Sequence, residues 1–242
     1  MRKRKYLIGA LAGVIGTLVL SGTASAAVTN QTLKTTVSPG KAPKKTFAPV
    51  KAFTNVVDTA YTGGFLPNGT QTVLKFSKDV KFTAGNIPQC QLSQVDRQKQ
   101  SVAQANCASS IVGTGSAIIN DGALTGKVTA FNGAKVGGNS TIYLHTAVFT
   151  PSGTEVLDPT LTGVLNAKSN TLTVDIPPTG TSITHFDTTI TKKKSGKKTF
   201  YVMARCRKGK WLHSETTTFS DGTTQTASSK QKCKATGGKK KK

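Results

Sequence analysis

The stretch Thr171-Leu172-Thr173-Val174-Asp175-Ile176 places an apolar side chain at every second position, with Thr or Asp between them. Successive side chains of a strand point to opposite faces of the sheet, so this alternation predicts a β-strand with one buried and one solvated face. The segment Thr141–Phe149 is apolar on both faces, which is typical of a central strand covered on both sides.

Outward from these two strands, turn signals such as Asn132-Gly133 and Asp221-Gly222 separate further short apolar runs. Strand-and-turn spacing of roughly 8 to 12 residues predicts an all-β fold, an antiparallel β-sandwich of about 9 to 11 strands. Besides strands on either side of Ser77-Lys78-Asp79, the predicted strands cover residues 111–119, 126–131, 141–149, 154–167, 171–176, 182–191, 199–206, 211–219 and 223–232.

One segment departs from this pattern. Residues 91–106 contain no Gly or Pro and carry apolar residues near helical spacing, between Cys90 and Cys107. A helix along the whole segment would separate its ends by about 20 Å, whereas the Cα atoms of a disulfide lie within about 7 Å. Either the helix is shorter and the chain folds back, or the cysteines pair differently. We expect one short helix over Ser93–Val102.

The N-terminus has the form of a secretory signal. Arg2-Lys3-Arg4-Lys5 precedes an apolar run from Leu7 to Leu20, and Ala24-Ser25-Ala26 has the small-x-small form of a cleavage site. The apolar run is shorter than the roughly 20 residues of a spanning helix. We therefore expect a secreted, extracellular protein with no membrane span after cleavage, in which Cys90–Cys107 and Cys206–Cys233 form disulfides.

These features predict the domain organisation of the chain. Residues 1–26 are the signal peptide, and the Thr-, Lys- and Pro-rich residues 27–48 are expected to form a flexible leader. A single β-sandwich domain is expected over residues 49–234, followed by a basic disordered tail over 235–242.

The last three predicted strands test the second cysteine pair. Tight turns at Lys208-Gly209 and Asp221-Gly222 would place Cys206 opposite Trp211 and Cys233 opposite Lys210. The two cysteines would then flank the middle strand, roughly 9 to 10 Å apart, which no disulfide spans. The third strand must therefore leave the sheet before Cys233, or one turn is longer. In this register Trp211 packs against the disulfide.

Six short runs are distinctive: Pro88-Gln89-Cys90, Val112-Gly113-Thr114-Gly115-Ser116-Ala117, Thr129-Ala130-Phe131-Asn132-Gly133, Ile142-Tyr143-Leu144-His145, Val174-Asp175-Ile176-Pro177-Pro178 and Gln231-Lys232-Cys233. From about Phe53 to Lys234 the chain resembles a group of uncharacterised exported β-rich proteins of soil actinobacteria with two disulfide pairs. The resemblance implies the domain boundaries and the cysteine pairs, and it implies no activity.

The chain carries a formal net charge of +23 over 242 residues. The signal holds four of the 33 basic residues and none of the ten acidic ones, which leaves +19 after cleavage. Clustered cations attract anions without sequence specificity. The candidate anion-binding residues are Lys192, Lys193, Lys194, Lys197, Lys198, Arg205, Arg207, Lys208, Lys210, Lys239, Lys240, Lys241 and Lys242. The alternative is that these lysines only maintain solubility and block pairing of sheet edges.

Candidate catalytic residues are few. His213 and Glu215 would share one face of a strand, whereas His145 lies in the most apolar strand and is expected to be a core residue. Asp58, Asp158, Asp175 and Asp187 are scattered singly along the sequence. No His or Cys spacing indicates a metal site, and we expect no metal or cofactor. Tyr61, Tyr143 and Tyr201 remain candidate platforms for sugar stacking.

The sequence therefore predicts an exported non-catalytic β-sandwich that acts at the cell envelope or extracellularly by weak binding of anionic polymers or polysaccharide. Nucleic acid would be bound only non-specifically, and nothing in the sequence assigns an oligomeric state. The alternative hypothesis is a secreted hydrolase that uses the His213/Glu215 pair.

We predict that the signal is removed after Ala26, because Ala24 and Ala26 occupy the small-residue positions of the cleavage site. The intact mass of the exported protein measures this directly. A mass that retains Arg2 to Lys5 would contradict cleavage and indicate a membrane anchor.

Overall fold

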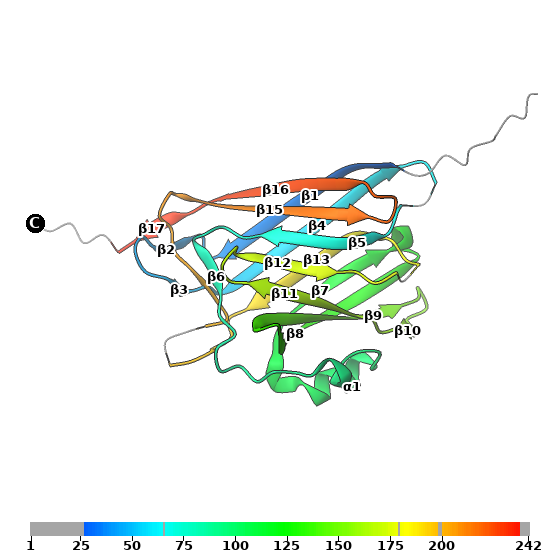
Figure 1. Ribbon diagram of the computed structural model, residues 1–242, viewed down its shortest axis with the longest axis horizontal. Helices are drawn as coiled ribbons and strands as arrows, with labels where there is room; N and C mark the ends of the chain where they lie inside the picture. The colour runs from blue at the N-terminus through cyan, green and yellow to red at the C-terminus, as the bar shows by residue number, and fades with distance from the viewer. Residues whose placement is uncertain (1–26, 65, 179, 198–199, 238–242) are drawn as a thin grey trace, which may run out of the picture.

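The computed structural model describes residues 27–64, 66–178, 180–197 and 200–237, and within these ranges strands dominate (Figure 1). The strands are β1 (Ala27–Ser38), β2 (Lys41–Pro43), β3 (Ala48–Pro49), β4 (Ala52–Thr62), β5 (Gly69–Lys75), β6 (Val80–Phe82), β7 (Ile111–Ile119), β8 (Leu124–Val136), β9 (Asn139–Phe149), β10 (Glu155–Leu157), β11 (Thr160–Asn166), β12 (Thr171–Asp175), β13 (Ile183–Thr191), β14 (Val202–Ala204), β15 (Lys210–Phe219), β16 (Thr224–Lys232) and β17 (Lys234–Thr236). The helices are α1 (Gln100–Asn106) and the short 3-10 turns η1 (Leu92–Gln94), η2 (Ala108–Ser110) and η3 (Asn120–Gly122).

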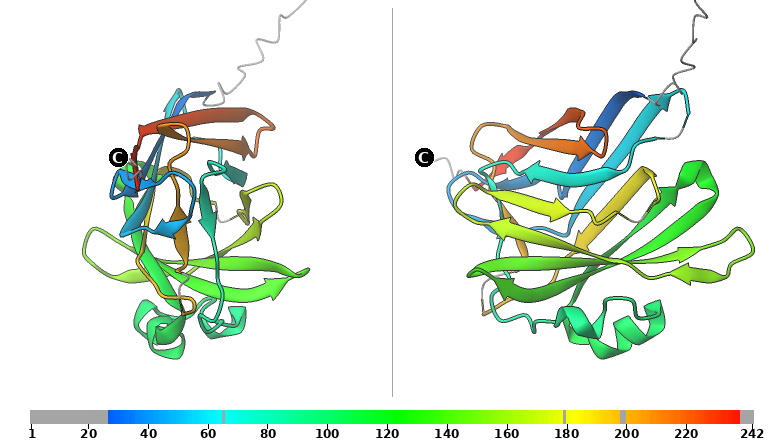
Figure 2. Two further views of the ribbon diagram at one scale, coloured as in Figure 1. Left: turned by 90° about the vertical axis from the view of Figure 1, so that its left-hand side faces the viewer. Right: turned by 45° about the vertical axis from the view of Figure 1, so that its right-hand side comes forward.

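One large antiparallel sheet organises the described chain. Its strand order is β1-β4-β13-β7-β8-β9-β11-β12-β5-β15-β16, with β10 added beside β9. The sheet curls into a nearly closed barrel-like shape, and α1 packs against the outside of β8 and β9 (Figure 2). A three-stranded sheet of β3, β14 and β6 and the parallel pair of β17 and β2 complete the fold.

The first and last strands of this sheet, β1 and β16, meet along a seam that side chains close. The Gln231 amide accepts a hydrogen bond from the Val37 N–H at 2.6 Å and donates one to the Val37 carbonyl at 3.0 Å. Ser229 Oγ accepts from the Thr35 N–H at 2.9 Å, and Gln225 Nε2 donates to the Val28 carbonyl at 3.1 Å. Side chains of β16 thus form hydrogen bonds with backbone groups of β1 that would otherwise be unpaired at the edge of the sheet.

The inner face of the curled sheet forms the main core. Phe53, Phe76 and Phe82 make edge-to-face and tilted ring contacts 4.6 to 5.6 Å apart, and Trp211 and Tyr201 are fully buried in the same cluster. This aromatic group fills one end of the barrel, the end at which β15 begins with Lys210.

The predicted all-β fold with antiparallel sheets, one short helix and the disulfides Cys90–Cys107 and Cys206–Cys233 is confirmed. Their Cα atoms lie 5.6 and 6.0 Å apart. The described residues contain more strands than the nine to eleven expected, because several are two- or three-residue segments without a turn signal.

The expected flexible leader over 27–48 is wrong, since this segment contains β1, β2 and the first residue of β3. In β1 the buried positions alternate as Gln31, Leu33, Thr35 and Val37. Two of these four side chains are polar, with partners on β15 and on the neighbouring strand β4, so the hydrophobic alternation that marks a strand is missing.

The helix was expected at the wrong place. Residues 93–102 contain the end of η1, a loop and only the start of α1, which runs over Gln100–Asn106. The chain folds back between the two, because the Asn106 side chain donates to the Gln94 carbonyl at 3.0 Å. This fold-back brings the two cysteines together.

The predicted hairpin at Lys208-Gly209 is also wrong. Strand β14 pairs with β3 and β6 and not with β15. The β15–β16 hairpin exists, but Lys210 pairs with Lys232, one residue from the expected register, because the turn closes between Phe219 and Thr223. Cys233 leaves this hairpin, as expected, and β17 follows it into the pair with β2.

Two of the predictions concern the ends of the chain. Residues 235 and 236 belong to β17, so the expected disordered tail does not start at 235. The expected signal peptide over 1–26 and residues 238–242 lie outside the described residues.

We predict that Gln231→Leu destabilises the fold by about 2 kcal/mol, because both backbone groups of Val37 lose their partner at a half-buried site. Ser229→Ala should cost about 1 kcal/mol for the same reason. Urea unfolding measures both effects.

The matched control is Ser228→Ala, since Ser228 is exposed on the other face of the same strand. It should change stability by less than about 0.5 kcal/mol. Equal effects of the Ser228 and Ser229 variants would mean that the seam does not hold the sheet closed.

Candidate functional site

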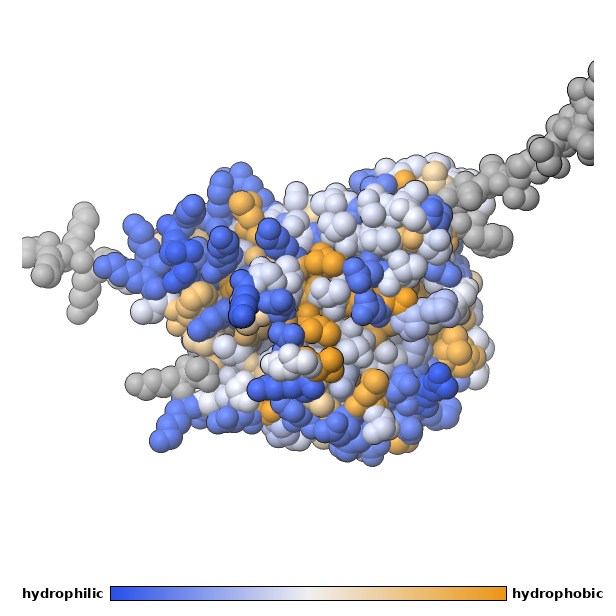
Figure 3. Space-filling view, in the orientation of Figure 1, coloured by the Kyte–Doolittle hydropathy of each residue, from blue (hydrophilic) through white to orange (hydrophobic). Residues whose placement is uncertain are grey.

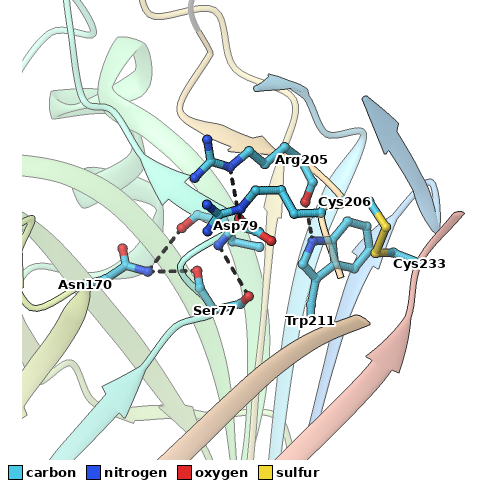
Figure 4. Close-up of polar contacts among 9 residues, drawn as sticks. Ser77, Asp79, Asn170, Arg205, Cys206, Trp211 and Cys233 are labelled. Atoms are coloured by element: carbon cyan, nitrogen blue, oxygen red, sulfur yellow. Dashed lines mark hydrogen bonds and ion pairs between the residues drawn. A yellow bond between two sulfur atoms is a disulfide. The ribbon is translucent and has the colours of Figure 1, made fainter. Parts of the chain in front are cut away.

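Three segments that are distant in sequence meet at the end of the barrel where β15 begins. The Cys206–Cys233 disulfide joins two of them, and Trp211 packs beside it as predicted (Figure 4). Three backbone bonds of 2.9 Å tie the segments together: Cys206 N–H to the Pro43 carbonyl, Cys233 N–H to the Gly209 carbonyl and Lys234 N–H to the Gly40 carbonyl.

This arrangement places lysines directly opposite one another. Lys41 is the register partner of Lys234 in the β2–β17 pair, and Lys210 is the partner of Lys232 in the β15–β16 pair. Together with Lys208, these exposed lysines form what we call the basic end. Hydrophilic side chains gather over it in the space-filling view, on the left in Figure 3.

The arginines beside the basic end have an internal partner. Asp79 is buried, and its Oδ1 accepts from Arg205 Nε at 2.9 Å and from Arg207 Nε at 2.6 Å (Figure 4). The Arg205 backbone N–H donates to the Asp79 carbonyl at 2.8 Å, and Trp211 Nε1 donates to the Arg205 carbonyl at 2.7 Å. These contacts commit one donor of each arginine to the fold, whereas no ion pair is found for the lysines of the basic end among the described residues.

Asn170 fixes the loop that carries Asp79. Its side-chain amide donates to the carbonyls of Phe76, Ser77 and Val80 at 2.9 to 3.1 Å. Its backbone has a φ of 57°, a left-handed conformation that Asn adopts more readily than most residues. The carboxylate of Asp79 is therefore held at a defined position under the two arginines.

The second expected lysine cluster follows β13. Lys192, Lys194 and Lys197 are exposed, and Lys192 Nζ lies 5.0 Å from the centre of the Phe200 ring. Lys193 is half-buried. Lys198 and Lys239 to Lys242 lie outside the described residues. The expectation that the 205–210 cluster surrounds a hairpin tip is wrong, since β14 and β15 do not pair.

His213 and Glu215 share the inward face of β15, and both side chains are buried. Their contacts lead to different partners. His213 Nδ1 accepts from the Ser77 N–H at 3.4 Å, and its ring meets Phe53 and Phe76 edge-on. Glu215 Oε2 accepts from Asn55 Nδ2 at 3.4 Å. The hydrolase hypothesis on this pair stays a prediction, and none of these contacts joins the two groups.

Burial is the main cause that shifts the pKa of both groups toward the neutral form, and for Glu215 the hydrogen bond from Asn55 opposes it. The pKa of His213 falls from 6.5 to about 4 and the pKa of Glu215 rises from 4.5 to about 7. Near pH 6 the native protein therefore holds a neutral imidazole and a protonated carboxyl in its interior.

The remaining carboxylates are less scattered than expected. His185 Nδ1 lies 2.6 Å from Asp58 Oδ1 and its Nε2 lies 3.4 Å from Asp187 Oδ2, so β4 and β13 bring the two aspartates to one imidazole. The hydrogen bond to Asp58 is the main cause that raises the pKa of His185. Asp175 accepts from Gln71 at 2.8 Å on the exposed face.

A separate polar group lies beside α1. His145 is fully buried, as expected of a core residue, and its Nε2 is 2.7 Å from the Gln98 carbonyl. Burial, followed by the hydrogen bond to Glu155, raises the pKa of Asp158 to about 6. Glu155 Oε1 accepts from the Gln100 N–H at 2.8 Å, which anchors the first residue of α1.

The tyrosine platforms are largely excluded by burial, since Tyr143 and Tyr201 have exposed fractions of 4% and 0%. Within the described ranges, no three His, Cys, Asp or Glu side chains are grouped to hold a metal ion. No helix in the same part of the chain has the length and apolarity to cross a membrane.

Searches against protein-family models, curated proteins and solved structures find no match to this chain. The resemblance to exported actinobacterial proteins therefore stays a prediction.

Sequence reasoning missed Asp79 and the lysines of β2 and β17. No local signal links residues 41 and 234, because their pairing depends on the path of the chain after the disulfide. The inward position of Glu215 could have been predicted from the sequence, since Trp211, His213 and Glu215 share one face and Trp211 was expected inside.

We predict that Glu215→Gln becomes progressively more stable relative to the wild type as pH rises from 4.5 to about 7. The native pKa of Glu215 is raised, so between pH 4.5 and about 7 this carboxyl is ionised in the unfolded chain but still largely protonated in the native protein. The wild type therefore loses stability as pH rises across that window. The full gain above pH 7 should be roughly 3 kcal/mol. Urea unfolding at a series of pH values measures the difference.

Glu155→Gln is the control of opposite sign. The hydrogen bond from the Gln100 N–H is the main cause that lowers the pKa of Glu155, so its ionised form favours the native state. That variant should lose stability relative to the wild type as pH rises toward 4.5 from below, and the difference should stay constant above 4.5. A Glu215→Gln difference that is flat between pH 4 and 8 would contradict the burial of an ionisable carboxyl.

Proposed function

We propose that the protein is exported and acts by binding anionic polymers of the cell envelope, such as teichoic acids or acidic polysaccharides, through the basic end. The observation that carries this proposal is the pairing of Lys41 with Lys234 and of Lys210 with Lys232. The two disulfides support export, because disulfides persist in oxidising compartments.

Like charges directly opposite one another destabilise a sheet, and Cβ atoms of such pairs lie about 5 Å apart. The nearby carboxylate of Asp79 is buried and already engaged by Arg205 and Arg207. An external anion that bridges the paired lysines would relieve this repulsion. The fold thus maintains a charge arrangement that a bound polyanion stabilises.

A single exposed lysine contributes little affinity in water, at most about 1 kcal/mol for an exposed ion pair. A polymer with repeated charges contacts several lysines at once, and its binding gains from multivalency. Lys192, Lys194 and Lys197 extend the cationic surface available to such a chain. The interaction is therefore weak per site, tolerant of polymer sequence and sensitive to salt.

We predict that Lys41→Thr/Lys210→Thr/Lys234→Thr binds purified wall teichoic acid about tenfold more weakly than the wild type, because three exposed charge contacts of roughly 0.5 kcal/mol each are lost. Wild-type binding should itself fall steeply between 0.05 and 0.2 M salt, as the Debye length shrinks to about 8 Å. Co-sedimentation with cell wall and polymer titration across a salt series measure both effects.

The matched control is Lys34→Thr/Lys99→Thr/Lys127→Thr, which removes the same net charge from exposed lysines outside the basic end. It should bind within about twofold of the wild type, since only the long-range field changes. Equal losses of affinity in both triple variants would mean that the net charge alone, and not the basic end, determines binding. Retention that ignores salt would contradict the electrostatic mechanism.

A further inference from the structure

The interior of the curled sheet is not completely filled. A cavity of about 130 Å³ lies between β4, β5, β9, β11, β12, β13 and β15. Most of its lining is aliphatic or aromatic, including Leu144, Leu161, Leu172, Val174 and Ile190. An apolar cavity of roughly 150 Å³ is sufficient to hold a benzene-sized molecule.

One wall of this cavity is polar. Glu215, Asn55, Gln31 and Thr217 all line it, and each is more than nine-tenths buried. Their hydrogen bonds to one another are incomplete. Gln31 Nε2 donates to Thr217 Oγ1 at 2.9 Å, whereas Gln31 Oε1 is buried without a partner among the described residues.

Glu215 is also poorly satisfied for a buried carboxyl. Among the described residues its hydrogen-bond donor is Asn55 Nδ2, at a long distance of 3.4 Å. Asn55 Oδ1 in turn accepts a hydrogen bond from Thr35 Oγ1 at 2.9 Å. A buried polar group without good partners costs about 1 to 3 kcal/mol. A wall that combines such groups with an open volume has the composition of a ligand site, in which a few polar groups orient an apolar molecule.

Phe53, Phe76 and Phe82 line the cavity on the side of the basic end. At the opposite end the lining residues include Thr59, Thr181 and Ile183. Half-buried side chains occur at both ends, Phe82 at the first and Thr59 and Ile183 at the second.

We propose that this cavity binds a small neutral apolar compound with a hydroxyl group, of the size of a simple phenol, whose hydroxyl bonds to Glu215 and Gln31. A hydroxyl can donate to Gln31 Oε1 and can also accept from a protonated carboxyl. A cationic head is disfavoured, because it would lose its hydration in an apolar cavity whose carboxyl is itself largely neutral. The ring or alkyl body would pack against Leu144, Leu172 and Val174.

The test compares two probes of nearly equal shape, p-cresol and 4-fluorotoluene, in which fluorine replaces the hydroxyl. Isothermal titration of the mature protein at pH 6 should show both compounds bound, with p-cresol about tenfold tighter, because one hydrogen bond contributes about 1 to 1.5 kcal/mol. Equal affinities would overturn the role of the polar wall, and the absence of binding by both would overturn the site.

Variants assign the preference to Glu215. Glu215→Met keeps the side-chain length and should bring p-cresol to within twofold of 4-fluorotoluene, whose own affinity stays unchanged. A p-cresol preference that survives Glu215→Met would contradict the role assigned to Glu215. If the methionine variant folds poorly, the affinities of both probes are measured on Glu215→Gln, which retains a polar amide. Thr216→Ala, on the other face of β15, should change neither affinity.

Leu172→Trp tests the location of the site, since Leu172 lines the cavity and is half-buried. This variant should weaken both probes at least tenfold by filling the volume. Unchanged binding of both probes would place them elsewhere on the protein.

Discussion

The seam between β1 and β16 is the constraint on which the rest of the structure depends. A curled antiparallel sheet that does not close leaves two edges of unpaired backbone groups. Here Gln225, Ser229 and Gln231 bond to the backbone of β1 in place of a backbone ladder. Closure by side chains lets the two strands run in the same direction without a regular parallel ladder, and it gives the inner face a continuous lining.

The closure of the sheet explains why the sequence predicted β12 as a strand but did not predict β1. Leu172 and Val174 face an apolar interior, so their alternation with Thr and Asp is visible locally. Gln31 and Thr35 face inward as well, but their side chains meet polar partners, Thr217 on β15 and Asn55 on the neighbouring strand β4. A polar residue that is buried against a polar partner cannot be distinguished from a solvated one until the partner is placed.

The same reasoning separates the predictable parts of the candidate site from the rest. The disulfides followed from the spacing of the cysteines, and Trp211 packs beside Cys206 although the hairpin register that predicted this contact does not form. The basic end did not, because β2, β3, β14 and β17 are two- or three-residue strands with no pattern of their own. The pairing of β17 with β2 depends on the path of the chain after it leaves the β15–β16 hairpin at Cys233, and β14 pairs with β3 and β6 from distant parts of the sequence.

The basic end lies at one end of the barrel and the cavity in its interior, and the aromatic group of Phe53, Phe76 and Phe82 lines the cavity between them. Asp79, with Arg205 and Arg207, supports the basic end from the outside of that group, whereas Glu215 and Gln31 face the cavity on its inner side. Close-packed interiors have low compressibility and transmit strain, so this aromatic group connects the two regions physically. Strand β15 is a second connection, since it begins at Lys210 and carries Glu215. It is held on both sides by antiparallel partners, β5 and β16.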